Sequence, residues 1–204
     1  DEARYAQVAR EMFERGDWVT PTLGGFHWFE KPALLYWLEI ASYHVFGVSE
    51  FAARFGPAVF GIGTVLSLWI LGRSISSSAA APTQFTTTIA LVAASTLGIL
   101  AFAHGASFDI IVTFPITASL VSFYIWHSKY KTGGVTNGHG VSPSLILFYV
   151  FIGVALLAKG LIGAVFPLAI VSFYYLLSRK LPSRTLVVSL LWGALIAIAV
   201  AATW

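Results

Sequence analysis

Long apolar runs separated by short polar stretches dominate the chain after residue 50. A helix that crosses a membrane needs about 20 consecutive, mostly apolar residues. The runs lie at 54–73, 84–104, 107–126, 144–178 and 185–204. This pattern predicts an all-α fold, a polytopic transmembrane helix bundle.

The run at 144–178 is too long for one membrane helix. In a single helix it would be about 52 Å long, whereas the hydrocarbon core of a bilayer is about 30 Å thick. Lys159-Gly160 lies near its middle. We therefore predict a break at Lys159-Gly160 that gives a hairpin of two short spans, and about six spans in total.

The first fifty residues follow a different pattern. In residues 1–16, apolar side chains recur with helical spacing between polar ones, and Gly16 is a plausible stop. This predicts an amphipathic helix, too polar to span, that lies at the membrane interface. Residues 33–47 are apolar but too short for a span, which predicts a second interfacial helix. We therefore divide the chain into a first external loop, 1–50, and a transmembrane bundle, 51–204.

Composition agrees with a membrane location. Hydrophobic residues make up 57% of the chain and charged residues 10%, against about 25% charged in a soluble domain. Mean hydropathy is +0.80. We expect membrane lipids, and no nucleic acid, as partners. Because the chain starts at Asp1 and ends inside an apolar run at Trp204, we also expect it to be a fragment of a longer membrane protein.

The loop cations predict the orientation of the bundle. With the hairpin at Lys159, six lysines and arginines share one side, which the positive-inside rule assigns to the cytoplasm. They are Arg73, Lys129, Lys131, Arg179, Lys180 and Arg184. The acidic residues of the external loop, together with Asp109 and Lys159, then lie at the opposite, outer face.

Asp109, Lys159 and the Glu30-Lys31 pair are candidates for chemistry, since charged groups at membrane depth are costly. One interpretation is that Asp109 and Lys159 sit at helix ends or pair with each other. The other is a site. A carboxylate serves as a base, lysines attract phosphate, and apolar walls suit a lipid tail. This combination suggests a polyprenyl phosphate held at the outer membrane surface.

Two motifs carry a family resemblance. DEARYAQVAREMFERGDWVTPTLGG, followed by FEKPALLYWL, resembles membrane glycosyltransferases of the GT-C type that use a polyprenyl-phosphate sugar donor. The similarity is to the branch of the aminoarabinose transferase of lipid A and the protein O-mannosyltransferases. It is strong over residues 1–50 and looser around Asp109 and ALLAKGLIGAVFPL at 155–168.

The resemblance implies roles for individual residues. The acidic motif of the first external loop carries the catalytic carboxylate, which matches Asp1 with Glu2 beside it, and Asp109 matches a later acidic position. The Lys of the FEKP-like motif contacts the donor phosphate. The implied phosphate-binding residues are Lys31, Lys159, Arg4 and Tyr5. Leu161 stands where the family often has proline.

Metal binding is a further expectation at one point only. His27 and Glu30 lie three residues apart, so both could face one divalent ion. A lone histidine next to Trp28 is more often an ordinary interfacial residue. No other cofactor is expected.

Three functions are compatible with these patterns. The first is transfer of a sugar from a polyprenyl phosphate to lipid A, another glycan or lipid, or a protein. This reaction would take place outside the cytoplasm, in the bacterial inner membrane. The second is a transporter or flippase for a lipid-linked or anionic substrate, although the sequence shows no internal repeat. The third, a non-catalytic scaffold, leaves the outer charges unexplained.

Overall fold

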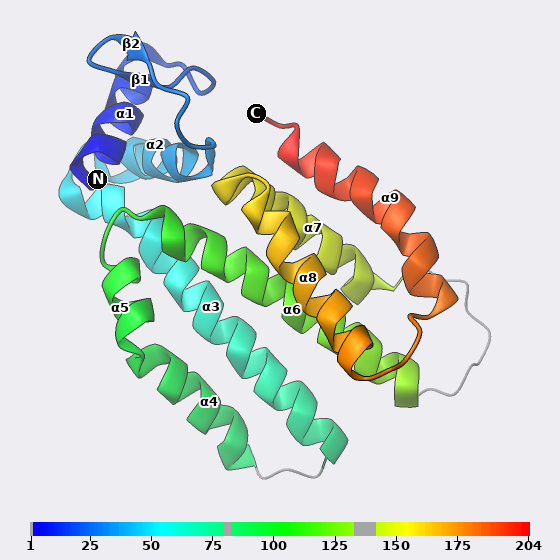
Figure 1. Cartoon of the computed structure of the whole chain (residues 1–204). Helices are drawn as coiled ribbons and strands as arrows, with labels where there is room; N and C mark the ends of the chain where they lie inside the picture. Colours follow the sequence, from blue (N-terminus) through cyan, green and yellow to red (C-terminus); the bar gives the residue numbers. More distant parts are fainter. Residues whose placement is uncertain (1, 80–82, 133–141) are drawn as a thin grey trace.

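Helices make up nearly the whole described structure (Figure 1). The structure, a computed structural model, describes residues 2–79, 83–132 and 142–204. Asp1 lies outside these residues. The elements are α1 (Glu2–Arg15), β1 (Thr22–Leu23), β2 (Phe26–His27), α2 (Leu34–Phe46), α3 (Glu50–Ala79), α4 (Thr83–Ser95), α5 (Leu97–Ala103), α6 (Phe108–Thr132), α7 (Pro143–Lys159), α8 (Ile162–Leu177) and α9 (Arg184–Ala201). The predicted all-α membrane bundle is confirmed.

The first external segment contains the two predicted short helices. α1 covers the helix expected in residues 1–16, and α2 lies within 33–47. α1 ends at Gly16, whose φ of 67° favours glycine. Between the helices, β1 pairs antiparallel with β2, with Thr22 opposite His27.

A buried cluster fixes the external segment on the helix bundle. Val8 and Met12 of α1 and Ile40 of α2 are almost completely buried in it. The rings of Tyr5 and Tyr36 both meet Phe108 of α6 edge to face, at centroid distances of 4.8 and 5.8 Å. Edge-to-face aromatic pairs add to the free energy gained from burial alone. The segment is therefore held against the start of α6.

Glu39 is an unusual member of this buried region. Its side chain is fully buried, and neither carboxylate oxygen has a hydrogen-bond partner among the described residues. Burial raises the pKa of the Glu39 carboxyl well above its ordinary value, and the Glu2 carboxylate adds to the effect. Burial thus favours the neutral form of Glu39, whose side chain belongs to the core.

The described apolar helices fall into two classes of length. Three described helices are long and apolar enough to cross a membrane, and the bent pair α4–α5 makes a possible fourth. α7 and α8 have 17 and 16 residues. They are therefore only about 25 Å long, less than a hydrocarbon core of about 30 Å. The sequence predicted two short spans here, and the total of about six spans stays a prediction.

The predicted hairpin between α7 and α8 is confirmed. α7 ends at Lys159, Gly160 adopts a φ of 66°, and α8 begins two residues later. The two helices pack very closely, because a Cβ atom added to Gly163 would lie 2.2 Å from the Ala155 carbonyl oxygen. Glycine at these two positions permits both the turn and the close approach.

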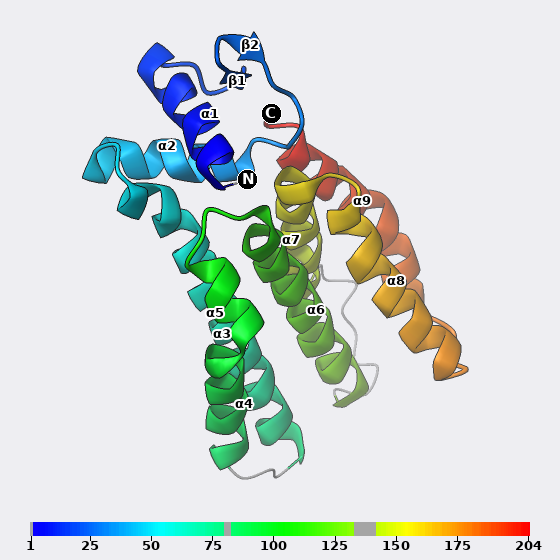
Figure 2. The same ribbon diagram turned by 60° about the vertical axis from the view of Figure 1, so that its left-hand side comes forward.

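Figures 1 and 2 show that the connections of the bundle gather at two opposite ends. We name these two ends after the predicted orientation. The outer end carries α1, α2, the α5–α6 connection and the α7–α8 turn, and the inner end carries the carboxyl ends of α3, α6 and α8. Arg73, Lys129 and Arg179 therefore lie toward the inner end, as predicted, while Asp109 and Lys159 lie at the outer end.

Candidate active site

A polar pocket of about 370 Å³ opens at the outer end of the bundle. Its walls come from α1, from the loop before α2, from α5 and the start of α6, and from the end of α7. The lining residues are Glu2, Tyr5, Lys31, Ala101, Phe102, Gly105, Ala106, Ser107, Phe108, Asp109 and Lys159. Five of the nine residues proposed from the sequence thus share one cavity, although they lie up to 157 positions apart (159 − 2).

Asp109 and Lys159 form an ion pair across the pocket, as one interpretation of the sequence suggested. Asp109 lies in the first turn of α6, where the Ser107 hydroxyl accepts a hydrogen bond from its backbone N–H. Lys159 is the last residue of α7, where a cation complements the helix dipole. Their side chains remain 50% and 32% exposed, so both are accessible to a ligand.

Glu2 is held by two donors from other parts of the chain. Its Oε1 accepts a hydrogen bond from Arg54 Nε at 2.6 Å and another from the Ala106 backbone N–H at 3.1 Å. The Arg54 hydrogen bond is the main reason that the pKa of the Glu2 carboxyl is lower than usual, and it outweighs burial, which acts in the opposite direction. Glu2 is therefore ionised at the pocket wall.

Arg54 is a site residue that the sequence analysis missed. It belongs to α3, where its Nη1 also lies 3.8 Å from Glu50 Oε2 at i,i+4 spacing. That spacing was the only local signal, and it does not reveal Glu2 as a partner. The contact with Glu2 arises because α1 and α3 both pack against α2.

Lys31 lines the pocket and is paired with its neighbour Glu30, with 3.2 Å between Nζ and Oε1. Glu30 also meets Arg4, with 3.8 Å between Oε2 and Nη1. The Arg4 guanidinium lies 5.8 Å from the centre of the Trp28 ring. Arg4 is therefore beside the pocket and not in its lining. Its predicted contact with the donor phosphate stays a prediction.

The two proposed metal ligands, His27 and Glu30, contact different neighbours. His27 is in β2 with its ring stacked on Phe29 at 6.0 Å, whereas the carboxylate of Glu30 is paired with Lys31 and Arg4. Within residues 2–79, 83–132 and 142–204, no three His, Cys, Asp or Glu side chains are grouped as a metal site. The expectation of a metal at His27 and Glu30 therefore gains no support from the geometry.

Tyr5 forms an apolar wall of the pocket, since its ring is buried against Phe108. Asp1 lies outside the described residues, so its role as the catalytic carboxylate stays a prediction that rests on the family resemblance. Glu2, the next residue, lines the pocket. The described pocket thus combines two lysines from distant elements with carboxylates and an apolar wall, a set suited to a phosphate carried by a lipid.

Fold and pocket together define an integral membrane protein whose charged groups converge on one cavity at the end of an apolar helix bundle. The full chain, residues 1–204, matches the family described as PMT, dolichyl-phosphate-mannose-protein mannosyltransferase, and the chain belongs to this family.

Two curated relatives share the name undecaprenyl phosphate-alpha-4-amino-4-deoxy-L-arabinose arabinosyl transferase. The protein of Aeromonas hydrophila is 31% identical over 185 residues, which cover 89% of this chain and 31% of the relative. That of Yersinia pestis is 35% identical over 154 residues, 69% of this chain and 26% of the relative. The chain thus spans about a third or less of these relatives.

Solved structures show the same fold. The crystal structure of ArnT from Cupriavidus metallidurans in the apo state matches with a TM-score of 0.84 and 24% identity, over all of this chain and 36% of that chain. The structure of the same protein bound to undecaprenyl phosphate matches with a TM-score of 0.70 and 23% identity, with the same coverage.

Proposed function

We propose that the protein of which this chain is a part is a glycosyltransferase that takes its sugar from a polyprenyl phosphate. The observation that carries the proposal is the convergence of Lys31 and Lys159 with Glu2 and Asp109 on one pocket. Family membership and the names of the relatives support the same reaction class. They favour it over the transporter and scaffold hypotheses.

The reaction assigns a part to each group. The acceptor hydroxyl attacks the anomeric carbon, its proton passes to the Asp1 carboxylate, and the bond from that carbon to the phosphate oxygen breaks with inversion. The phosphate leaves with the electron pair, and Lys31 and Lys159 stabilise its charge. Stabilisation of developing charge by positioned groups is usually a large catalytic contribution. Asp109 holds Lys159 in place, and Glu2 and Arg54 shape the wall beside it.

The proposal extends to location. We infer that the pocket faces away from the cytoplasm in the bacterial inner membrane, because the loop cations lie at the inner end. In intact cells, the Gly25→Cys variant of the full-length protein should react with a membrane-impermeant thiol reagent. The Asn137→Cys variant should react with it only after permeabilisation. Labelling of Asn137→Cys from outside would contradict this orientation.

Turnover by the purified full-length protein tests the activity. The protein should release polyprenyl phosphate from a radiolabelled polyprenyl-phosphate sugar, with lipid A as the first acceptor to test, and should not use nucleotide sugars. Net movement of the lipid-linked sugar across vesicles, without release of polyprenyl phosphate, would favour the transporter alternative instead.

A further inference from the structure

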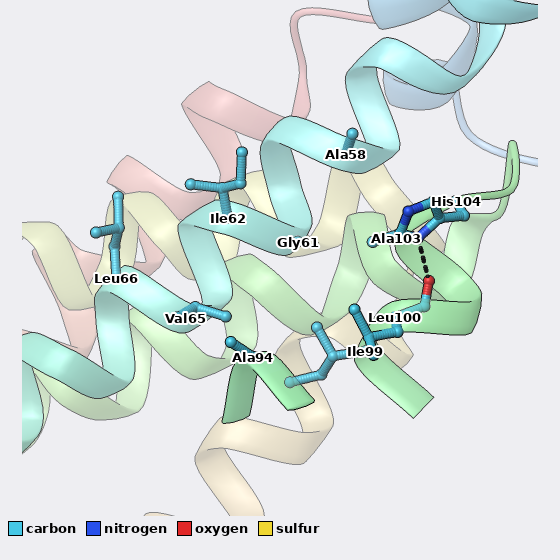
Figure 3. A pocket seen from close by; sticks show the side chains of 10 residues that line it. All are labelled: Ala58, Gly61, Ile62, Val65, Leu66, Ala94, Ile99, Leu100, Ala103 and His104. Carbon is cyan, nitrogen blue, oxygen red and sulfur yellow. Dashed lines mark hydrogen bonds between the residues drawn. The ribbon is translucent and has the colours of Figure 1, made fainter. Parts of the chain in front are cut away.

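A pocket of about 350 Å³, which we call the inner-end pocket, lies between α6 and α8 at the opposite end of the bundle from the candidate active site. It differs from the groove between α3 and the bent pair α4–α5 in Figure 3, whose lining is apolar apart from His104. The polar residues that line the inner-end pocket are Tyr124, His127, Ser128 and Tyr174. This pocket can therefore offer a ligand several hydrogen-bonding groups.

Apolar and polar groups follow the same order along both walls of the inner-end pocket. On α6, Phe123 comes before His127 and Ser128, and on α8, Ile170 comes before Tyr174. Both helices have their carboxyl ends at the inner end. The apolar part of the lining therefore lies toward the middle of the bundle and the polar part toward its end. A membrane lipid has the same order, with its acyl chains inside the bilayer and its head at the surface.

The His127 imidazole is held between the two walls of the pocket. Its ring stacks on Phe123 at a centroid distance of 5.8 Å and meets Tyr174 edge to face at 5.4 Å. Its Nε2 lies 3.0 Å from the Tyr174 hydroxyl, and its Nδ1 lies 3.4 Å from the Tyr175 hydroxyl. Hydroxyl and imidazole groups can donate hydrogen bonds to phosphate oxygens. The polar part of the pocket thus has ordered groups that suit a phosphate.

The turn that ends α8 carries two cations, Arg179 and Lys180, five and six residues after Tyr174. The Lys180 backbone N–H donates to the Tyr175 carbonyl at 3.2 Å, and the Arg179 backbone N–H donates to the Leu176 carbonyl at 3.1 Å, the pattern of a Schellman motif. Arg179 has a φ of 48°, a left-handed conformation that is unfavourable for arginine and that glycine usually supplies at this position. A cation therefore stands at the end of one pocket wall, where glycine would fit the backbone better.

These cations have no acidic residue near them in the sequence. The chain contains no Asp or Glu after Asp109, and the described acidic residues lie at the outer end. The charge of the inner end is therefore complementary to an anion from outside the chain. The anionic lipids of a cytoplasmic leaflet attract lysines and arginines, and basic pockets between membrane helices bind lipid head groups.

We propose that the inner-end pocket binds an anionic phospholipid of the surrounding membrane. Its phosphate accepts hydrogen bonds from His127, Ser128 and Tyr174. The turn at Arg179 complements the charge, and an acyl chain lies along Ile170 toward the middle of the bilayer. The proposed orientation places this lipid in the cytoplasmic leaflet. The site is separate from sugar transfer, because it lies at the opposite end of the bundle from the candidate active site.

Two substitutions test the charge and the space of the pocket separately. Arg179→Gly removes the cation and supplies the residue that a φ of 48° favours, so the fold should be kept. Ile170 lines the pocket and is 46% exposed, so Ile170→Trp fills space that the lipid would occupy. Leu168 lies on the same helix, is 38% exposed and does not line the pocket, which makes Leu168→Trp a matched control.

Native mass spectrometry of the full-length protein in a neutral detergent measures the affinity for individual lipids. The parent should bind short-chain phosphatidylglycerol more tightly than inorganic phosphate or phosphatidylcholine with the same chains. Arg179→Gly should weaken phosphatidylglycerol binding about fivefold, the equivalent of about 1 kcal/mol for one cation. Ile170→Trp should weaken it about tenfold, the scale on which apolar pockets discriminate. Leu168→Trp and Lys31→Ala should bind it like the parent, and no variant should lower the unfolding midpoint.

Three results would overturn the inference and leave the proposed function intact. In the first, the parent binds phosphatidylcholine or inorganic phosphate as tightly as phosphatidylglycerol. In the second, either Arg179→Gly or Ile170→Trp binds phosphatidylglycerol like the parent. In the third, Leu168→Trp or Lys31→Ala weakens binding as much as Ile170→Trp, which would assign the lipid to the surface of α8 or to the polar pocket at the outer end.

Discussion

The cations at the two ends of the helix bundle contact different kinds of partner. At the outer end, cations are paired with carboxylates, as in Glu2–Arg54, Glu30–Lys31 and Asp109–Lys159. At the inner end, two of the described polar side chains meet aromatic residues. Arg73 lies 5.5 Å from the centre of the Trp69 ring, and His127 contacts the hydroxyl of Tyr174 at 3.0 Å.

This difference follows from where acidic residues occur in the chain. Eight of the nine acidic residues lie in the first fifty positions, and the ninth, Asp109, folds back to the same end. Loop cations that have no carboxylate partner are sufficient to set the orientation of a helix bundle in the membrane. A site that must bind an anion and also move a proton needs both signs of charge, and only the outer end of the described structure provides them in one cavity.

The largest expected effect is at Asp1. In the full-length protein, Asp1→Asn keeps the shape of the side chain and removes its charge. Turnover should fall by about two to four orders of magnitude, the range for a general base, with donor affinity retained. A phosphate acceptor, already a good nucleophile, would reduce the loss. Glu14→Gln, on the exposed face of α1, is the control. Normal turnover of Asp1→Asn with a hydroxyl acceptor would exclude Asp1 from the mechanism.

Breaking the Asp109–Lys159 ion pair should have the next largest effect, and this effect is on donor affinity. Lys159→Met keeps the apolar stem and removes the charge, so donor affinity should fall about tenfold, because a hydrogen bond to a charged group contributes about 1.5–3 kcal/mol. The unfolding midpoint should hardly move, since exposed ion pairs contribute only about 0–1 kcal/mol.

Asp109→Asn completes this comparison, because it leaves the Lys159 charge unpaired and available to a phosphate. Donor affinity of Asp109→Asn should therefore be kept, and isothermal titration with polyprenyl phosphate measures both variants. If the two substitutions lower the unfolding midpoint alike and leave affinity unchanged, the pair is only structural.

A smaller, local effect is expected at Glu11, an outer-end charge away from the pocket. Its carboxylate accepts hydrogen bonds from the Thr22 hydroxyl at 2.7 Å and from the Gly24 backbone N–H at 2.8 Å. Burial alone would raise the pKa of Glu11, but these bonds outweigh it and lower the pKa from 4.5 to about 2. The hairpin should therefore be fully stabilised above pH 4.5 and lose this contribution as pH falls toward 2.

Hydrogen exchange at the Gly24 amide measures this effect. Glu11→Gln should speed exchange about fivefold, the equivalent of about 1 kcal/mol for one hydrogen bond, and should remove the pH dependence. Turnover should stay normal. Exchange that is equally slow in Glu11→Gln would show that the backbone pairing of β1 with β2 is sufficient to hold the hairpin.

Features that depend on neighbouring residues could be predicted from the sequence. The α7–α8 hairpin follows from Lys159-Gly160 in the middle of a run too long for one span, and α1 follows from its apolar period and Gly16. The placement of Lys31 in the pocket agrees with the FEKP-like motif.

Features that depend on packing could not be predicted in this way. Glu2 and Arg54 are 52 positions apart, and nothing local links them. The bend at Thr96 occurs in a continuously apolar run, where periodicity predicts one straight helix.

In the proposed reaction the outer end holds a lipid phosphate, and substitution of Lys31 tests this binding most directly. Equilibrium binding of polyprenyl phosphate without sugar should be about tenfold weaker in Lys31→Ala than in the parent full-length protein, given about 1.5–3 kcal/mol for a charged hydrogen bond. Lys31→Arg should restore part of the lost affinity, because arginine keeps the positive charge but carries it on a larger, planar head. Lys129→Ala, which removes the same charge at the inner end, should bind like the parent. Equal affinity of Lys31→Ala and the parent, with both proteins folded, would contradict the account and leave Lys31 as an interfacial anchor only.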